Sequence, residues 1–412
     1  MNWFGNFASV TGIGYLMFSV FIVASLGYLL GRITVKGVSL GTAGVFIIAL
    51  LFGCFFYSIL ERNTKGYTSS ALKIVENLGL VLFVTSVGFI AGPNFFSNLK
   101  KNFKSYILLG VLIIVVGGLS CAACIVFDIK LGRAPQEAAA MLVGLLSGSL
   151  TSTPAFSAAK ATVATAELES IVAVGHGIAY IYGVIGVVLF VQIVPKIIGA
   201  NMEEERSHLV AADAGSKKVY NGKLIEMDAY GFMPFALAAV VGILVGGIDW
   251  GKMIGTVLRH PEWSFTLTTT GGCLFVSLVF GHFAHVGPVD ITPLNITLKE
   301  FRELGLMLFL IGAGIAGGAS FVKYFEWVYF IYGIIMTTVP LIVGYFFARY
   351  VLKLSLLNNL GSITGGMTST PALGTLIATS GTENVASAYA STYPMALIAV
   401  VIVSQVLIIL FR

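Results

Sequence analysis

Long apolar runs separated by short polar connections are the feature that most restricts how this chain can fold. Each run comes close to the roughly 20 residues that an α-helix needs to cross a membrane. Charged residues make up only 10% of the 412 residues, whereas soluble domains carry about 25%. We therefore predict an all-α, polytopic membrane protein. The predicted apolar segments are Thr11–Leu30, Leu40–Leu60, Ser70–Ala91, Ser105–Phe127, Ala138–Thr162, Ile171–Ile198, Phe232–Ile248, Phe265–Phe283, Leu304–Phe321, Trp327–Val351, Leu356–Thr379 and Ser387–Phe411.

One polar stretch, Asn201–Asp228, interrupts this series and is rich in charged residues. It is too short to form a domain, because domains rarely have fewer than about 50 residues. We interpret it as a solvated loop between helices. The predicted organisation is therefore a first transmembrane repeat (1–200), a cytoplasmic linker (201–230) and a second transmembrane repeat (231–412).

The two halves resemble each other in sequence. Apolar helices can share Leu and Gly by chance, but a shared Thr-Ser-Thr-Pro-Ala within apolar segments, in matching order, is much harder to obtain. We infer an internal duplication. The matching blocks are Gly44–Gly53 with Gly272–Gly281, Leu78–Phe83 with Leu304–Phe309, Gly88 and Gly92 with Gly314 and Gly318, Gly144 and Gly148 with Gly361 and Gly365, and Thr151–Ala155 with Thr368–Ala372.

Lysine and arginine in the short loops indicate how the spans are oriented, because cytoplasmic loops carry an excess of them. The distribution favours an external N-terminus. The central loop is then cytoplasmic if one segment in each half fails to cross, and we assign that role to the two Thr-Ser-Thr-Pro segments. Five crossings per half, about ten in all, would invert the second half relative to the first. Inverted repeats with broken helices are typical of secondary transporters.

Each Thr-Ser-Thr-Pro segment is predicted to be a broken or re-entrant helical hairpin. Proline disfavours helix for the residue before it and removes a backbone donor. Small and hydroxyl residues precede the proline in both Gly144–Lys160 and Gly361–Ile377. We expect two half-helices joined by an extended tip. The expected N-caps are Thr153 and Thr370, each followed by a proline at the first helical position, Pro154 and Pro371.

The start of the second half-helix presents free N–H groups and a positive dipole end at each tip. Irregular backbone at membrane depth is tolerated only beside protein or a water-filled cavity. Two tips that meet near the midplane would therefore suit an anionic substrate; a proline kink repaired by Ser and Thr side chains is the alternative. The predicted substrate-binding residues of the tips are Thr151, Ser152, Thr153, Pro154, Thr368, Ser369, Thr370 and Pro371.

Few ionisable residues lie inside the predicted spans. Lys73 and Glu76 lie near the start of the third span, and Arg302 and Glu303 lie just before the matching span of the second half. We expect these four side chains at the membrane interface, where long charged side chains can reach water.

Two ionisable residues lie deeper. His176 lies in the sequence Gly-His-Gly-Ile-Ala-Tyr, and Lys160 follows the first tip by less than two turns. A buried histidine is often a core residue, but ionisable groups inside membranes tend to be functional. Lys160 has no counterpart, because Ile377 occupies the matching position. We keep both as candidate substrate-binding residues.

The remaining motifs favour packing. Each Gly-x-x-x-Gly pair, Gly88 with Gly92 and Gly314 with Gly318, lies on one helix face and favours close helix approach; sliding of one domain past another is the alternative. The four cysteines lie in apolar runs, so we assign them to packing rather than to redox or metal chemistry. We expect no metal and no cofactor.

Taken together, these motifs resemble the aspartate:alanine exchanger family. The resemblance rests on paired Gly-x-x-x-Gly-x-x-Thr-x-Thr-Pro-Ala segments, each preceded by Leu-Gly-Leu-x-Leu-Phe and followed by a Tyr-containing helix. It covers nearly all of the membrane part in both halves. It implies a secondary transporter of small amino acids or dicarboxylates. A weaker architectural likeness to the glutamate:sodium symporters implies an elevator-type movement and a homodimer.

The helix after each tip usually starts with a Gly-Tyr-Ala-type sequence and carries a later Tyr-Pro. The second half keeps both features within Ala388–Pro394, which adds Tyr389 and Tyr393 to the residues implied to bind substrate. The first half has His176 in place of the first tyrosine and no proline. Typical members also carry two regulatory ligand-binding domains between the halves. This chain has only Asn201–Asp228 there, so we expect no regulation of that kind.

The favoured function is exchange of small amino acids or dicarboxylates by alternating access. The alternatives are an ion- or proton-coupled symporter or exporter of organic anions, and a channel. We do not expect an enzyme, because the chain lacks His-Glu-x-x-His, Gly-x-Ser-x-Gly and paired intramembrane Asp. The expected partners are the substrate, membrane lipid and a second copy of the chain, with no nucleic acid. The expected location is the bacterial inner (plasma) membrane, with both termini outside.

Overall fold

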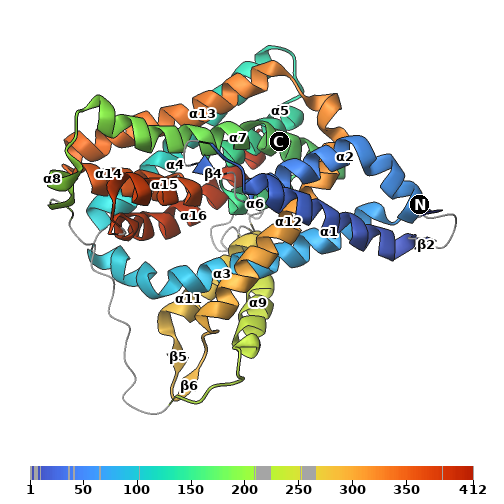
Figure 1. The fold of residues 1–412 in the computed structure, drawn as a ribbon, viewed down its shortest axis with the longest axis horizontal. Helices are drawn as coiled ribbons and strands as arrows, with labels where there is room; N and C mark the ends of the chain where they lie inside the picture. The colour runs from blue at the N-terminus through green and yellow to red at the C-terminus, as the bar shows by residue number, and fades with distance from the viewer. Residues whose placement is uncertain are drawn as a thin grey trace.

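The computed structural model describes residues 2–3, 8–9, 11–35, 38–39, 42–64, 66–101, 103–207, 209, 224–250, 252, 266–382 and 384–411. For residues 2–3, 8–9, 34–35, 38–39, 43, 94–101, 103–104 and 370–371 it describes the backbone only. The described chain is nearly all helical (Figure 1). The helices of the first half are α1 (Gly12–Gly31), α2 (Ala43–Thr64), α3 (Thr68–Lys101), α4 (Leu108–Lys130), α5 (Pro135–Ser149), α6 (Thr153–Thr162) and α7 (Ala166–Ile197), with a π-helical turn, η1 (Phe103–Ile107), before α4.

The second half repeats this order of elements. A short helix, α8 (Met202–Ser207), lies in the central linker. The helices that follow are α9 (Phe232–Gly247), α11 (Thr268–Phe283), α12 (Asn295–Tyr324), α13 (Trp327–Phe346), α14 (Leu356–Gly366), α15 (Thr370–Ser380) and α16 (Val385–Leu410), with a π-helical turn, η2 (Phe347–Val351), after α13. Three antiparallel hairpins of two-residue strands complete the described fold: β1 (Asn2–Trp3) with β2 (Ala8–Ser9), β3 (Thr34–Val35) with β4 (Val38–Ser39), and β5 (His285–Val286) with β6 (Val289–Asp290).

The predicted polytopic membrane protein is confirmed at the level of its helices. Among the described residues, eight helices are long and apolar enough to cross a membrane, and α9 and α11 are shorter apolar helices of 16 residues each. Many large apolar side chains on the outer faces of these helices are exposed, including Phe21, Phe55 and Leu119. Outward-facing apolar side chains suit a protein surrounded by lipid.

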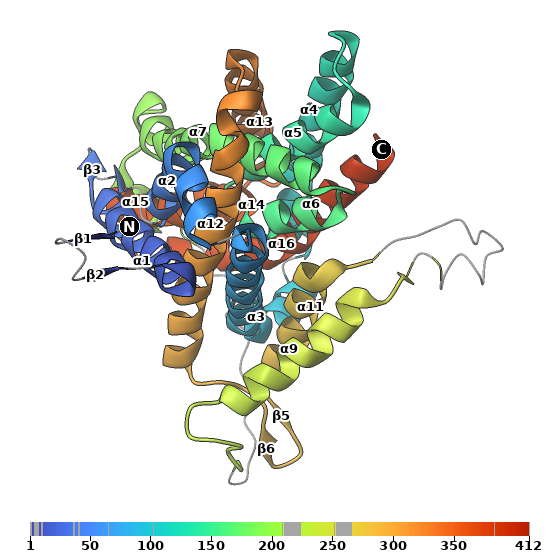
Figure 2. The same cartoon turned by 90° about the vertical axis from the view of Figure 1, so that its right-hand side faces the viewer.

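The helices form two bundles that pack against each other (Figures 1 and 2). We call α1, α2, α3, α9, α11 and α12 the flanking bundle. We call α4, α5, α6, α7, α13, α14, α15 and α16 the core bundle. In Figure 1 the flanking bundle occupies the lower and right parts of the molecule, and the core bundle occupies the upper left. The bundles meet where α6, α7 and α16 contact α3, α11 and α12.

Glycines allow the flanking helices to approach closely, as the sequence predicted. A Cβ on Gly92 of α3 would lie 2.6 Å from the carbonyl oxygen of Leu278 in α11. A Cβ on Gly318 of α12 would lie 2.1 Å from the carbonyl oxygen of Leu50 in α2. Backbone at these distances leaves no room for a side chain. The two contacts join equivalent positions of the two halves, so the matched glycines make matched packing.

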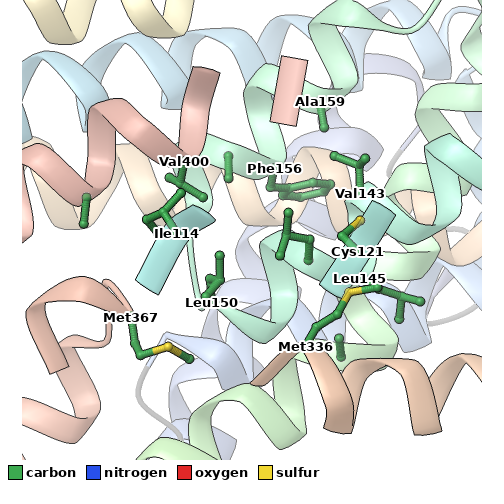
Figure 3. Packing of buried hydrophobic residues seen from close by; sticks show 14 of the residues in the cluster. Ile114, Cys121, Val143, Leu145, Leu150, Phe156, Ala159, Met336, Met367 and Val400 are labelled. Atoms are coloured by element: carbon green, nitrogen blue, oxygen red, sulfur yellow. The ribbon is translucent and has the colours of Figure 1, made fainter. Parts of the chain in front are cut away.

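The core bundle is filled by apolar side chains around the two broken helices. Leu150 and Phe156 from the first broken helix and Met367 from the second lie in one buried cluster with residues of α4 and α16 (Figure 3). Cys121 belongs to the same cluster, and its thiol donates a hydrogen bond to the carbonyl of Leu142. These closely packed side chains determine where each broken helix turns.

Candidate functional site

Both Thr-Ser-Thr-Pro segments fold as two half-helices joined by a short non-helical tip, as predicted. In the first half α5 ends at Ser149 and α6 begins at Thr153; in the second α14 ends at Gly366 and α15 begins at Thr370. The prediction of Thr153 and Thr370 as N-caps was wrong by one residue, because the extended N-caps are Ser152 and Ser369. The Oγ of Ser152 accepts a hydrogen bond from the backbone N–H of Ala155 at 3.3 Å.

The two tips share an unusual backbone conformation. Thr151 has φ 52° and Thr368 has φ 51°. A β-branched residue with positive φ is an outlier, because its Cβ crowds the backbone. Such strain persists only where surrounding contacts hold it, and it clusters at functional sites. Its occurrence at the same position of both tips shows that the two tips have the same backbone turn.

Crossed hydrogen bonds hold the tips against each other. The hydroxyl of Thr368 donates to the carbonyl of Leu150 at 2.8 Å, and the hydroxyl of Thr151 donates to the carbonyl of Met367 at 3.3 Å. Each strained threonine therefore bonds to the residue just before its counterpart. The broken helices of the two halves, more than 200 residues apart in sequence, meet at one point inside the protein.

A cavity of about 950 Å³ opens beside this meeting point. Its wall includes Thr151, Ser152, Thr153 and Pro154 of the first tip and Thr368 of the second. The cavity lies between the bundles, because its other wall is formed by α1, α3 and α12. The structure thus brings five of the eight predicted tip residues to one cavity.

The cavity wall also carries charges that the sequence analysis did not assign to a site. Arg32 at the end of α1 and Arg302 and Glu303 of α12 line it. The guanidinium of Arg302 donates to the carboxylate of Glu303 at 2.7 Å. The sequence duplication could have indicated this site, because Arg302 occupies the position that matches Glu76 and both halves therefore carry a charged residue there.

Four tyrosines add to the polar part of the wall. Tyr389 and Tyr393, which the family resemblance implied, line the cavity together with Tyr28 and Tyr180. The rings of Tyr389 and Tyr393 stack at 5.0 Å. In the first half the equivalent pair is His176 and Tyr180, whose ring centroids are also 5.0 Å apart. The cavity therefore combines cations, hydroxyls and aromatic faces.

His176 lies behind the cavity wall rather than on it. Its ring is fully buried and stacks on Phe156 of α6 at 4.1 Å, with an interplanar angle of 7°. Its Nδ1 lies 2.8 Å from the hydroxyl of Ser147, and its Nε2 has no hydrogen-bond partner among the described residues. In this structure His176 supports the tip helix and Tyr180.

Lys160 also lies away from the described cavity wall. Its ammonium donates to the carboxylate of Glu76 at 2.6 Å, and both side chains are largely buried. Ser369 is fully buried, and its hydroxyl has no partner among the described residues. The side chains of Thr370 and Pro371 lie outside the described residues. Among those residues, no three His, Cys, Asp or Glu side chains gather as metal ligands would.

Comparison with known proteins places this architecture in a family. A sequence model described as "Predicted Permease Membrane Region" matches residues 19–196 and again residues 234–409, once in each half. An uncharacterised transporter of Bacteroides thetaiotaomicron is 25% identical, with the alignment covering 95% of this chain and 97% of the relative. The alignment extends over 547 positions, so that relative contains residues that this chain lacks.

Other relatives carry similar names. An uncharacterised transporter of Desulfotalea psychrophila is 25% identical, over 95% of this chain and 96% of the relative. An uncharacterised transporter of Geobacter sulfurreducens is 31% identical over 60% of this chain and 42% of the relative. The family model covers both helical halves, and these relatives are transporters by name. This chain, a multi-pass membrane protein, belongs to the aspartate:alanine exchanger family.

Proposed function

We propose that the chain is a secondary transporter that exchanges small amino acids or dicarboxylates, and that the cavity at the two tips is its substrate site. The observation that carries this proposal is the meeting of two strained, matched tips at the wall of one large cavity between two bundles, whose mostly apolar lining also carries hydroxyls and charges. A volume of about 950 Å³ lies within the usual range of small-molecule sites and leaves room for a small amino acid or dicarboxylate with several waters.

The charge of the cavity favours an anionic substrate. Two guanidinium groups, those of Arg32 and Arg302, and one carboxylate, that of Glu303, lie on its wall. The N-termini of α6 and α15 lie at the tips, and each contributes roughly half a positive charge. Arg302 already donates to Glu303, so a substrate carboxylate would compete with Glu303 for that guanidinium. The tyrosine hydroxyls and the carboxylate of Glu303 would accept hydrogen bonds from a substrate ammonium group.

The repeat supports alternating access as part of this proposal. The same family model matches both halves, and equivalent glycines make equivalent contacts in the flanking bundle. In a carrier with inverted halves, movement of one bundle against the other opens the same midplane site first to one side of the membrane and then to the other. We propose that the core bundle, which contains both broken helices, is the moving part of an elevator-type carrier. The division at residues 1–200 and 231–412 belongs to this proposal.

The proposed orientation has both termini outside, the central linker in the cytoplasm and the chain in the bacterial inner membrane, as the loop charges indicate. In that orientation the ends of α1 and α3 and the start of α12, which border the cavity, face the cytoplasm. We propose a homodimer that leaves the core bundle free to move. Cysteine labelling of single loop positions in intact cells would test the orientation, and the mass of the purified protein would test the dimer.

Uptake into proteoliposomes tests the function. Labelled amino acids and dicarboxylates are offered to vesicles with and without preloaded counter-substrate. Exchange predicts saturable uptake that a preloaded substrate stimulates. Saturable uptake without this stimulation would point to a symporter, and uptake that does not saturate would point to a channel.

A matched pair of arginine variants tests the site. Arg302→Gln removes a guanidinium from the cavity, and Arg62→Gln removes one from the end of α2, away from the described cavity wall. Loss of a charge-assisted hydrogen bond weakens binding by about 1.5–3 kcal/mol, which predicts a rise in KM of roughly tenfold or more for Arg302→Gln alone. Equal kinetics in both variants would remove Arg302 from the substrate site.

A further inference from the structure

Three ion pairs connect the bundles at one end of the molecule. Each joins the segment that ends α6 and begins α7 to α3 or α12 of the flanking bundle. The pairs are Lys160 with Glu76 at 2.6 Å, Glu169 with Lys73 at 2.9 Å, and Glu167 with Lys323 at 2.8 Å. The segment 160–169 is therefore tied to the flanking bundle from two sides.

The three pairs differ greatly in burial. The side chains of Lys160 and Glu76 are 7% and 11% exposed. At least one partner in each of the other two pairs is more than half exposed. Exposed pairs contribute little, because water and salt screen them, whereas separating a buried pair without water would leave two uncompensated charges. Lys160 and Glu76 are therefore the pair that can hold this end closed.

The exposed ion pair at Lys323 lies at the opposite end of α12 from Arg302, and the buried pair lies between them, because Glu76 packs beside Gly312 of α12. On α12, Arg302 borders the cavity and Lys323 belongs to an ion pair. Their separation of 21 positions in sequence corresponds to about 30 Å of helix at 1.5 Å per residue, which is the thickness of the hydrocarbon core. On α3, Glu76 lies toward the start of the helix and Ala91, on the cavity wall, toward its end.

The cavity end lacks the equivalent pair. The residue that matches Glu76 is Arg302, and the residue that matches Lys160 is Ile377. Arg302 and Ile377 cannot form an ion pair, and the cavity opens beside Arg302. Two ends built from the same repeat therefore differ in one respect that bears on closure: one carries a buried ion pair and the other does not.

We propose that the Lys160–Glu76 pair is the gate that closes the end of the carrier opposite to the cavity mouth, and that it breaks and becomes hydrated each time the carrier turns over. The proposal rests on the alternating access of the proposed function. The pair holds α6, whose N-terminus forms the first tip, against α3 of the flanking bundle. Opening the gate would expose the face of α6 that now packs on α11.

Thiol labelling measures this opening without any substrate. Ser157 of α6 is buried, and its hydroxyl lies 2.7 Å from that of Thr270 in α11. Ser157→Cys, in a background with the four native cysteines replaced, therefore reports on separation of α6 from α11. We expect a maleimide to label it slowly in the otherwise unchanged protein in detergent. Glu76→Gln leaves Lys160 buried and unpaired, which favours the hydrated state, so labelling should accelerate at least tenfold.

Two further variants test whether the labelling rate depends on the paired charges or on the size of the side chains. The swap Glu76→Lys with Lys160→Glu restores a pair and should return labelling toward the original rate. Lys73→Gln removes an exposed charge on the same helix and should leave the rate within about twofold, since exposed pairs contribute at most ~1 kcal/mol. If Glu76→Gln fails to fold, Lys160→Met takes its place, because it leaves the carboxylate of Glu76 buried and unpaired, and accelerated labelling is again expected.

Unchanged labelling in any folded variant that lacks the pair would overturn the gate, as would equal acceleration by Lys73→Gln. An accelerated swap variant would also overturn it, because pairing would then not matter. Transport is measured in parallel on the same proteins. Absence of transport in every protein, with the labelling pattern as expected, would refute the proposed function and leave the gate as a conformational contact.

Discussion

Removing the hydroxyl of Thr368 is the most direct perturbation of the crossed tips. Thr368→Val keeps the branched Cβ and nearly the same volume, so neither a cavity nor a new backbone strain accompanies the change. It deletes the 2.8 Å hydrogen bond to the carbonyl of Leu150. A typical intramolecular hydrogen bond contributes ~1 kcal/mol net, and a buried group left without a partner costs about 1–3 kcal/mol. We therefore expect a loss of ~2 kcal/mol of stability.

Thr151→Val deletes the matching bond, which is longer at 3.3 Å, and should cost ~1 kcal/mol, at the low end of the same range. Thr368→Ser keeps the hydroxyl and serves as the control. The assay is the unfolding temperature of the detergent-solubilised protein, where a few degrees are expected for Thr368→Val, together with uptake into proteoliposomes. We expect uptake to fall much further than stability, because the tips form the cavity wall.

The refuting result is specific. Thr368→Val with wild-type unfolding temperature and wild-type uptake would show that the crossed bonds do not position the tips. Equal loss in Thr368→Ser and Thr368→Val would show that the methyl group or the backbone, and not the hydroxyl, is responsible. Either result would remove the tip contact from the argument for a shared substrate site.

Three smaller predictions test the framework and its caps. Gly53→Ala places a Cβ 2.2 Å from the carbonyl oxygen of Ile315 and should lower the stability of the fold by about 3 kcal/mol, which is measured as a lower yield of folded protein. The control is Gly247→Ala, whose Cβ would have nothing within 4 Å and which should leave the yield unchanged. Ser152→Ala removes an N-cap and should lower stability by ~1 kcal/mol and uptake more strongly. Backbone N–H groups at the start of α9, above all that of Met233, lower the pKa of Asp228. Its carboxylate therefore stabilises the start of α9 fully above the ordinary aspartate pKa of about 4 and progressively less below it. The unfolding temperature of Asp228→Asn should therefore lie below that of the wild type at pH 7, and the difference should shrink as the pH is lowered.

The sequence predicted the helices because their cause is local. Apolar runs of sufficient length form spans wherever they occur, and each Thr-Ser-Thr-Pro segment combines a proline with hydroxyl residues that can cap a new helix. The exact caps were less predictable, because Ser and Thr both cap helices well. Here Ser152 and Ser369 take the cap positions, while Thr151 and Thr368 adopt the left-handed backbone that turns each tip.

The charged part of the cavity could not be located from the apolar pattern. The apolar run begins at Leu304, so Arg302 and Glu303 were expected at the membrane interface. The helix begins nine residues earlier, at Asn295, so these side chains lie two turns inside α12 and on the cavity wall. The partner of Lys160 was equally hidden, because Glu76 lies 84 residues away in sequence and only the packing of α6 on the flanking bundle brings them together.

In a duplicated chain, comparison of the two halves separates residues that build the framework from residues that give the halves different roles, which is not possible in a single domain. Residues that match between the halves, such as Gly92 with Gly318 and Thr151 with Thr368, make the same contact twice. Such residues build a frame with two equivalent ends, and equivalent ends alone give no preference for one access state. A preference requires positions where the halves differ in charge. The pair of positions that holds Glu76 and Lys160 in one half holds Arg302 and Ile377 in the other. The same mismatch gives one half a buried ion pair and the other a guanidinium on the cavity wall, so in the mechanism that we propose closure and substrate attraction arise from one departure from symmetry.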